Sequence, residues 1–452
     1  MYIVLSINQK KDSMKKCDFL ALLNAMNIQA NQIEKIATDT GFLVRKGLVE
    51  PADILYAICC QSILGTVSFN DLAAKIDAET AISVSRQAIA KKTGKESCVD
   101  FLKKILALVI ISRIGKEEID ALRQAGKFKR VLVQDSTIIK LPVRLFGFFS
   151  GVSNGHCSVC NARIQCVYDL ITESFICFTI DPYTKNDLKA APELSVEKDD
   201  LVLRDRGYLT MKEVERHLTS GADCIYRHQS NMIFLDCQTR ERINLLAELQ
   251  SKKQLDIQVI LNNESGTKIR IVALPVSEEI ANKRRMKAKK ESHREPGKDC
   301  LALMSWSIFI TTISKQDADY NFLFRVYSLR WRIEIIFKSW KSNMEFSKIH
   351  NVSKKQLSLI LYARFIMIII YIQYIFSPAR MITKKQLKKE LSMIKVVRYL
   401  IKNTSKIIQI VKAIEIYKDK LCYHLKALAR YCSYDKRVRA NFEQEFDAAF
   451  LP

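Results

Sequence analysis

The 452-residue chain lacks several features that define whole classes of protein. Its first residues, MYIVLSINQKKDSMKK, contain no long apolar core and no small-residue cleavage site, so we expect no secretory signal. Its 13 cysteines are odd in number and irregularly spaced, which does not fit a disulfide framework. There is no internal repeat and no low-complexity tract. These absences together predict a protein of the reducing cytoplasm.

Long apolar runs are also scarce, with one exception. The segment LSLILYARFIMIIIYIQYIF (357–376) is long enough to span a membrane, but Arg364 and Gln373 interrupt it. Lys354 and Lys355 precede it. Because the centre of a large protein also needs helices that are apolar on all sides, we expect a buried core helix and no membrane contact.

Acidic residues are too few to balance the basic ones. The chain has 72 Lys and Arg against 48 Asp and Glu, a formal net charge of +24 that is spread over the whole length. Such a charge favours a polyanionic partner, and nucleic acid more than a membrane surface. The length and the hydrophobic content of 48% leave room for about two to four domains with real cores.

Residues 1–125 are expected to form a helical region, because apolar and charged residues alternate at helical spacing and Gly and Pro are rare. Within it, residues 69–95 suit a helix-turn-helix. Its second helix would present polar and basic side chains: Ser85, Arg86, Gln87, Lys91 and Lys92. Two packed amphipathic helices with a solvated basic face explain the same residues, because no glycine marks the turn. Both interpretations remain open.

Residues 126–345 change to short β-rich runs. RVLVQDSTIIKL, NARIQCVYDL and SFICFTID are typical of strands, and a helix-like KNDLKAAPEL then precedes the strand DDLVLRDRGYL, which is an α/β order. Residues 229–300 contain a predicted hairpin and a basic run, so we interpret them as a β-rich insertion. Residues 346–452 are predicted to be helical, with an excess of Lys and Arg.

The segment YSLRWRIEIIFKSWK (327–341) surrounds one acid with cations. At about 100° per residue, a single helical stripe carries five functional side chains: Tyr327, Arg330, Glu334, Lys338 and Lys341. Trp331 lies at the margin of this stripe. A surface helix with salt bridges is one explanation, since Arg330 and Lys338 both stand four residues from Glu334.

Two other carboxylates favour a functional site instead. Asp135 lies within the apolar strand VLVQDSTIIKL, where an unpaired charge is costly to bury. Asp205 ends the strand LVLRD just before the turn RGY. Asp135 could instead point to solvent, and Asp205 could simply form a turn. Together with Glu334, they predict a cage for two Mg²⁺ ions, with Mn²⁺ as a substitute, because hard oxygen ligands suit these ions.

Such a cage would serve phosphodiester chemistry. Two ions activate a water or a 3′-hydroxyl and stabilise the leaving oxygen during in-line attack. The cations of the stripe, Arg330, Lys338 and Lys341, would then hold the phosphates on which the ions act. This explains why one acid lies among so many basic residues.

At these positions the sequence resembles the bacterial DDE transposases of the insertion-sequence-4 family. The family signature Y-(2)-R-(3)-E-(6)-K matches four residues: Tyr327, Arg330, Glu334 and Lys341. Asp135 in QDST and Asp205 in DRGY are similar to the first and second catalytic Asp of the family. The resemblance covers roughly residues 130–345, and it implies an RNase H-like catalytic core with a β-rich insertion.

The resemblance also implies roles for neighbouring residues. Tyr327, Arg330 and Lys341 would grip DNA phosphates at the end of the element. Trp331, in RWRIE, would help to hold a flipped base, and Trp306, in SWSIFITT, would be its stacking partner. The flanking helical regions would bind double-stranded DNA at the terminal inverted repeats and at the target, and would form a homodimer.

These observations predict a cut-and-paste DNA transposase that cleaves element ends and transfers the strands in a metal-dependent reaction. A metal-dependent DNA nuclease without strand transfer is one alternative. A domesticated copy that only binds DNA is another, although the intact set of two Asp and one Glu argues against decay.

The segment HCSVC (156–160) is a weaker candidate site. It offers His156, Cys157 and Cys160, but a single C-x-x-C without a second pair is weak support for zinc. A loop between two strands is the favoured interpretation.

Overall fold

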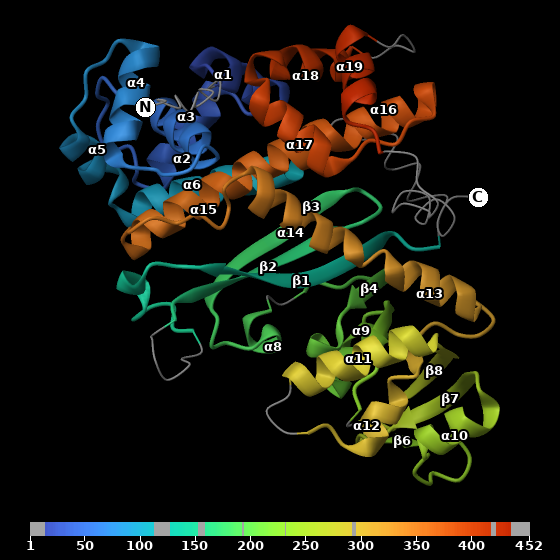
Figure 1. Ribbon diagram of the computed structural model, residues 1–452. Helices are drawn as coiled ribbons and strands as arrows, with labels where there is room; N and C mark the ends of the chain where they lie inside the picture. The colour runs from blue at the N-terminus through green and yellow to red at the C-terminus, as the bar shows by residue number, and fades with distance from the viewer. Residues whose placement is uncertain are drawn as a thin grey trace, which may run out of the picture.

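The computed structural model describes residues 14–112, 127–151, 159–191, 194–230, 232–291, 295–416 and 422–434. The fold is mixed α/β, and its sheet has nine strands. Helices from both ends of the chain, blue and orange to red in Figure 1, gather in one layer above the sheet. The first and last parts of the sequence therefore share a core.

The described N-terminal residues form helices, as predicted. The bounds are α1 (Lys16–Ala25), α2 (Ala30–Asp39), α3 (Pro51–Ser62), α4 (Phe69–Thr80), α5 (Arg86–Thr93) and α6 (Glu96–Ile111). Local sequence sets their starts: Pro51 opens α3, and the Ser68 side chain caps α4 by accepting from the Asp71 N–H at 3.0 Å.

Helices α4 and α5 are joined by residues 81–85. The side chain of Ser85 caps α5, and Ile89 and Thr93 are its buried residues. Lys92 is half-buried, and its ammonium donates to the Val49 carbonyl at 2.6 Å. Lys92 therefore helps to anchor α5, while Arg86, Gln87 and Lys91 stay exposed.

The sheet is built from strands spread over almost 200 residues. They are β1 (Arg130–Lys140), β2 (Asn161–Asp169), β3 (Ser174–Pro182), β4 (Asp200–Arg204), β5 (Asp223–Arg227), β6 (Phe234–Leu235), β7 (Leu255–Leu261), β8 (Lys268–Pro275) and β9 (Trp306–Thr311). Short helices α8 (Asp187–Ala190) and α9 (Met211–Thr219) connect β3 to β4 and β4 to β5.

The strand order is β3-β2-β1-β4-β5-β9-β8-β7-β6. Strands β1, β2 and β3 pair antiparallel, whereas β4 and β5 run parallel to β1. This order of the first five strands is that of an RNase H-like core, so the predicted fold class is confirmed.

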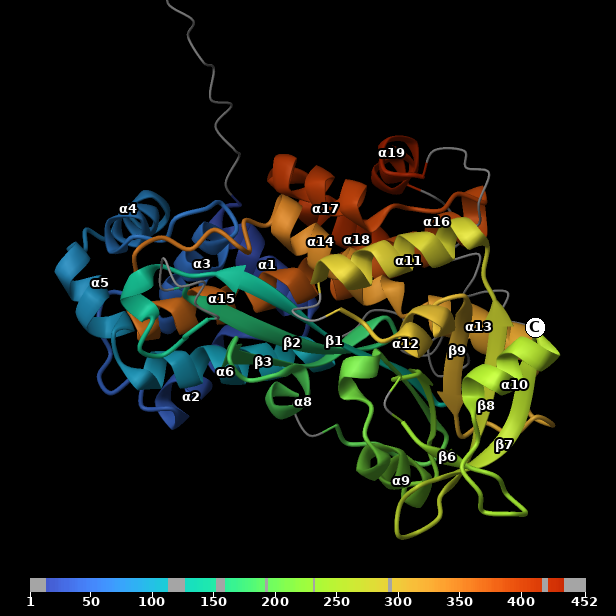
Figure 2. The same cartoon turned by 60° about the horizontal axis from the view of Figure 1, so that its bottom comes forward.

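Residues 229–300 extend the same sheet. They contribute β6, β7 and β8, together with α10 (Leu245–Lys252), α11 (Glu278–Glu291) and the start of α12 (Lys298–Leu303). The predicted hairpin is present as the antiparallel pair β7–β8, and β8 joins the core through β9. Figure 2 shows these strands at one end of the molecule, with α10 beside them.

The remaining residues are helical. They form α13 (Tyr320–Ser328), α14 (Trp331–Asn343), α15 (Lys354–Ile369), a π-helical segment (Ile370–Phe376), α16 (Ser377–Leu387), α17 (Met393–Lys402), α18 (Ile407–Glu415) and α19 (Tyr423–Tyr431). Among the described residues, the continuous helix Lys354–Leu387 is long and apolar enough to cross a membrane, but 94% of its apolar window is buried inside the protein. The predicted buried core helix is confirmed.

The two polar interruptions of that helix satisfy backbone groups of its neighbours. The Arg364 guanidinium donates to four carbonyls: those of Ser62, Gly65, Phe346 and Lys348. The Gln373 amide donates to the carbonyls at the end of α6 and accepts from the Phe175 N–H at 3.1 Å. Both side chains therefore fix other segments to the buried helix.

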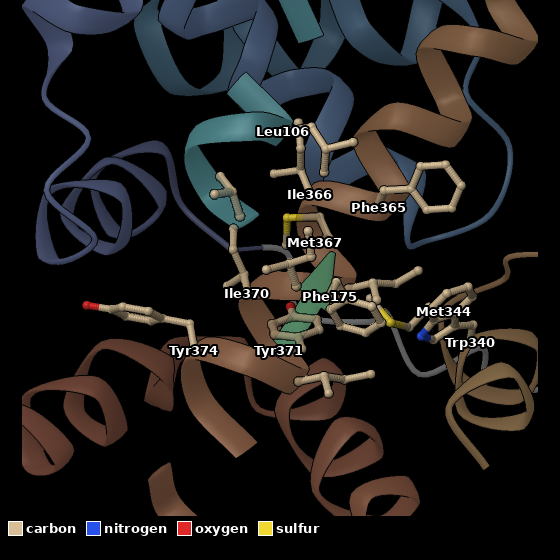
Figure 3. Packing of buried hydrophobic residues seen from close by; sticks show 14 of the residues in the cluster. Leu106, Phe175, Trp340, Met344, Phe365, Ile366, Met367, Ile370, Tyr371 and Tyr374 are labelled. Atoms are coloured by element: carbon tan, nitrogen blue, oxygen red, sulfur yellow. The ribbon is translucent and has the colours of Figure 1, made fainter. Parts of the chain in front are cut away.

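The core around α15 also supports α14. Figure 3 shows Phe365, Ile366 and Met367 of α15 packed between Leu106 of α6 and a cluster that includes Trp340. The indole of Trp340 is fully buried, and its ring centroid lies 5.9 Å from that of Phe175 in β3. Helix α14 is thus held from behind by apolar packing.

The segment 156–160 adds no described metal site. His156 and Cys157 lie outside the described residues, and Cys160 is buried. Every cysteine in the described part of the chain is a free thiol.

Candidate active site

Three acids come together where β1, β4 and α14 meet. Asp135 lies in the middle of β1. Strand β4 pairs with β1 in parallel, and in this register Gln134 lies opposite Arg204. Asp205 directly follows that last pair, so the register places it beside Asp135. Glu334 stands in the first turn of α14, which packs against β1. Two adjacent strands and one helix therefore deliver one carboxylate each.

A single guanidinium bridges two of these carboxylates. Arg330 donates from Nη1 to Asp135 Oδ2 at 2.9 Å and from Nη2 to Glu334 Oε1 at 2.7 Å. The residue is only 8% exposed, and its guanidinium lies 5.9 Å from the centre of the Tyr327 ring. Its Nε is buried without a hydrogen-bond partner. The site is therefore closed by an internal cation.

Burial and neighbouring charges raise the pKa of Asp135 to about 6. Loss of solvent is the main cause, and the charges of Glu334 and Asp205 act in the same direction. The Arg330 guanidinium and the Ser136 N–H, which donates to Asp135 Oδ1 at 2.7 Å, oppose the rise in pKa. The charges of Glu334 and Asp205 are thus close enough to affect the pKa of Asp135.

The donor set suits a hard divalent ion once the guanidinium moves. In the described part of the chain, no three His, Cys, Asp or Glu side chains are already arranged to hold a metal. Asp135, Asp205 and Glu334 nevertheless offer carboxylate oxygens, and all three are partly exposed. A positive charge already lies between Asp135 and Glu334, because the Arg330 guanidinium forms an ion pair with each of them.

The prediction of one helix over residues 327–341 is wrong. Helix α13 ends at Ser328 and α14 begins at Trp331. Between them the backbone hydrogen bonds change from the α-helical i−4 spacing to the i−3 spacing of a tighter turn. Arg330 N–H donates to the Tyr327 carbonyl, and Ile333 N–H donates to the Arg330 carbonyl. The Tyr327 ring consequently packs on Phe309, with centroids 4.5 Å apart, and its hydroxyl donates to the Arg204 carbonyl at 3.3 Å.

The other predicted site residues differ in exposure. Lys341 donates from Nζ to the Ile138 carbonyl at 2.9 Å, and burial lowers its pKa. Lys338 is exposed, and Trp331 is 60% exposed. Trp306 is half-buried at the start of β9, where its Nε1 donates to the Lys253 carbonyl at 3.3 Å. No ring contact joins the two tryptophans within the described ranges.

Sequence reasoning missed a cavity of about 90 Å³ that is lined in part by Arg206, the residue after Asp205. Its polar lining comes from segments far apart in the chain: Arg206, Arg227, His228, Ser230, Arg284 and Trp306. Arg206 follows Asp205 directly, which was the one available signal. The others meet only because β5 pairs with β9 and α11 lies across the start of β9.

A second group of residues, which sequence reasoning also missed, holds the strand next to Asp135 in place. Ser136, the next residue of β1, donates from Oγ to Asp187 Oδ1 at 2.6 Å. Arg163 of β2 pairs with the same carboxylate and donates to Ser136 Oγ at 3.0 Å. This network fixes the backbone position from which Asp135 projects.

Known proteins similar to this chain are transposases. Over 433 residues the chain is 27% identical to the transposase for insertion sequence element IS1151 of Clostridium perfringens, covering 90% of this chain and 89% of the relative. Over 390 residues it is 25% identical to the transposase for insertion sequence element IS231E of Bacillus thuringiensis subsp. finitimus, covering 80% of each. A solved synaptic complex of piggyBac transposase with hairpin DNA aligns with a TM-score of 0.42 and 11% identity, covering 96% of this chain and 88% of that chain.

The family described as Transposase DDE domain matches residues 126–370, more than half of the chain. That range contains the strands, the helix and the three acids described above. The chain therefore belongs to the Transposase DDE domain family, as a bacterial insertion-sequence transposase, an enzyme that cleaves and transfers DNA strands.

Proposed function

We propose that Asp135, Asp205 and Glu334 are the catalytic carboxylates of this transposase. Family membership implies a divalent metal, and we propose that the three acids hold two Mg²⁺ ions, for which Mn²⁺ can substitute. The observation that carries the proposal is the convergence of β1, β4 and α14: Arg330 bonds both Asp135 and Glu334, and the charge of Asp205 helps to raise the pKa of Asp135.

When bound, such ions supply an activated water or 3′-hydroxyl and stabilise the leaving oxygen of the phosphodiester. The chain's own groups orient the acids. The Ser136 N–H holds Asp135 Oδ1, so that Oδ2 faces Arg330 and the site. Glu334 is fixed by the rigid packing of α14, whose opposite face is buried.

The basic side chains of α14 are proposed to hold DNA phosphates. Lys338 is exposed, and Lys341 is held at the rim of the site by its bond to Ile138. Arg330 offers a planar, bidentate phosphate ligand. Because the Tyr327 hydroxyl already donates to a backbone carbonyl, its ring would support Arg330, and a phosphate contact would require release of that hydroxyl.

The two tryptophans are proposed to receive a base displaced from the duplex end. Trp331 is 60% exposed at the start of α14, so its ring is free to stack on a base. Trp306 lines the arginine-rich cavity, which could hold the phosphates of that nucleotide.

We propose double-stranded DNA as the partner, both at the terminal inverted repeats and at the target. The net charge of +24 and the exposed Arg86, Gln87 and Lys91 of α5 support a DNA contact by the N-terminal helices. The C-terminal helices are proposed to contribute further DNA contacts and to form a homodimer in the end complex. A nuclease without strand transfer would not join a labelled end to target DNA.

The variants Glu334→Gln and Asp205→Asn test the carboxylate assignment. Each keeps the side-chain shape and removes one negative charge, so binding to a duplex from the element end should stay near wild type while nicking in Mg²⁺ falls by about 100-fold or more. Glu248→Gln, a change at a surface acid paired with Lys252 on α10, is the matched control and should nick normally. Near wild-type nicking by Glu334→Gln would refute the assignment.

A further inference from the structure

Arg330 occupies the oxygens that the proposed metal ions would need. Its two terminal nitrogens bond Asp135 Oδ2 and Glu334 Oε1, one to each carboxylate. Among the described residues it is the one cation that bonds either acid, since Lys341 is directed to the Ile138 carbonyl. The guanidinium and a divalent ion therefore compete for the same ligands.

The bridging position leaves part of Arg330 unsatisfied. Its Nε–H is buried without a partner, although both terminal nitrogens are engaged. A guanidinium that pairs with a phosphate can instead present two parallel N–H groups to two oxygens. A DNA phosphate at the mouth of the site would thus offer Arg330 an alternative pair of acceptors, one that can also satisfy its Nε–H.

Arg330 stands in the short turn between α13 and α14, from which its side chain can change hydrogen-bond partners. Its backbone lies between the two helices, with helical hydrogen bonds to Tyr327 on one side and Ile333 on the other. Only the side chain needs to move, because the Tyr327 ring and the buried face of α14 keep the backbone in place.

We propose that Arg330 keeps Asp135 and Glu334 closed to divalent ions until a DNA phosphate takes its guanidinium. This rests on the proposed role of the carboxylates and adds an order to it: DNA binds first, and tight metal binding follows. Because coupling between two ligands is reciprocal, metal must also tighten DNA binding in the wild type.

Manganese affinity without DNA tests the proposal directly. The full chain and its variants are titrated with Mn²⁺, and free Mn²⁺ is measured by electron paramagnetic resonance. Arg330→Ala should bind Mn²⁺ about tenfold more tightly than wild type, within the range of ordinary coupling energies. Lys252→Ala removes an exposed cation that pairs with Glu248 on α10 and bonds none of the three acids, so its Mn²⁺ affinity should match that of wild type.

A second arm adds a duplex copied from the end of the element. The wild type should then gain Mn²⁺ affinity by about tenfold, whereas Arg330→Ala should gain little because its site is already open. Should Arg330→Ala fail to fold, Arg330→Lys replaces it; an ammonium cannot bridge two carboxylates as a fork does, so a smaller gain of about threefold is expected.

Two results separate this inference from the proposed function. If Arg330→Ala or Arg330→Lys binds Mn²⁺ no better than wild type, the closing role is overturned while the carboxylates can still be the ligands. If Arg330→Ala combined with Glu334→Gln keeps the full gain, the ion lies elsewhere and the carboxylate assignment itself fails.

Discussion

At the scale of single residues, Asp135 experiences opposing influences. Burial and the nearby acids raise its pKa to about 6, although Arg330 and the Ser136 N–H favour the charged form. Asp135 was identifiable from the sequence because a charged residue inside an apolar strand needs an explanation. Its bond to Arg330 was not, because that bond depends on how α14 packs on β1.

The raised pKa of Asp135 predicts a pH-dependent effect of Asp135→Asn on stability. Below about pH 4 the wild-type carboxyl is protonated in both the folded and unfolded states, so it causes no pH-dependent difference. Between about pH 4 and pH 6 the folded state holds its proton more tightly, so wild-type stability falls as pH rises. The free energy of unfolding of Asp135→Asn should therefore rise relative to wild type by up to about 3 kcal/mol across this window.

Urea unfolding of both proteins from pH 4 to pH 7 measures that difference. A gap between the two proteins that widens up to pH 6 and then levels off is the expected result. A constant gap at every pH would mean that Asp135 has an ordinary pKa in the folded protein.

At the scale of elements, the helix Lys354–Leu387 links distant parts of the chain. Its apolar residues made a buried helix predictable from composition, but the partners of Arg364 are 16 to 302 residues away in the sequence and could not be read from it. The break between α13 and α14 was equally hidden, because residues 327–341 contain neither Gly nor Pro. The turn is explained by the tertiary contacts of Tyr327 and Arg330 and not by local helix propensity.

Arg364→Met should destabilise the protein strongly. The change keeps an unbranched side chain but leaves the carbonyls of α3, its following loop and the residues after α14 without their donor. The expected loss is about 3 kcal/mol or more of unfolding free energy, measured in urea. Lys355→Met, at an exposed position in the first turn of the same helix, should change it by no more than about 0.5 kcal/mol. Equal effects from both changes would contradict the structural role of Arg364.

At the scale of the whole molecule, one sheet joins β1 and β4, which position two of the proposed catalytic acids, to residues 229–300. The sequence predicted the β7–β8 hairpin but not its place, because the register of β8 on β9 pairs residues from Pro275 with Trp306 to Arg270 with Thr311, which are 31 to 41 positions apart. The helices α1 to α6 share a core with α15, so the N-terminal region is packed onto the catalytic part and is not a loosely tethered module. The arginine-lined cavity is another product of this long-range assembly.

The most direct test of the central claim is a crystal structure of the transposase bound to an element-end duplex in Mn²⁺, with anomalous diffraction to locate the manganese. We predict anomalous peaks within bonding distance of the Asp135, Asp205 and Glu334 carboxylates, with the Arg330 guanidinium moved onto a DNA phosphate. Manganese bound elsewhere, with Arg330 still bridging Asp135 and Glu334 beside the bound DNA end, would contradict the account.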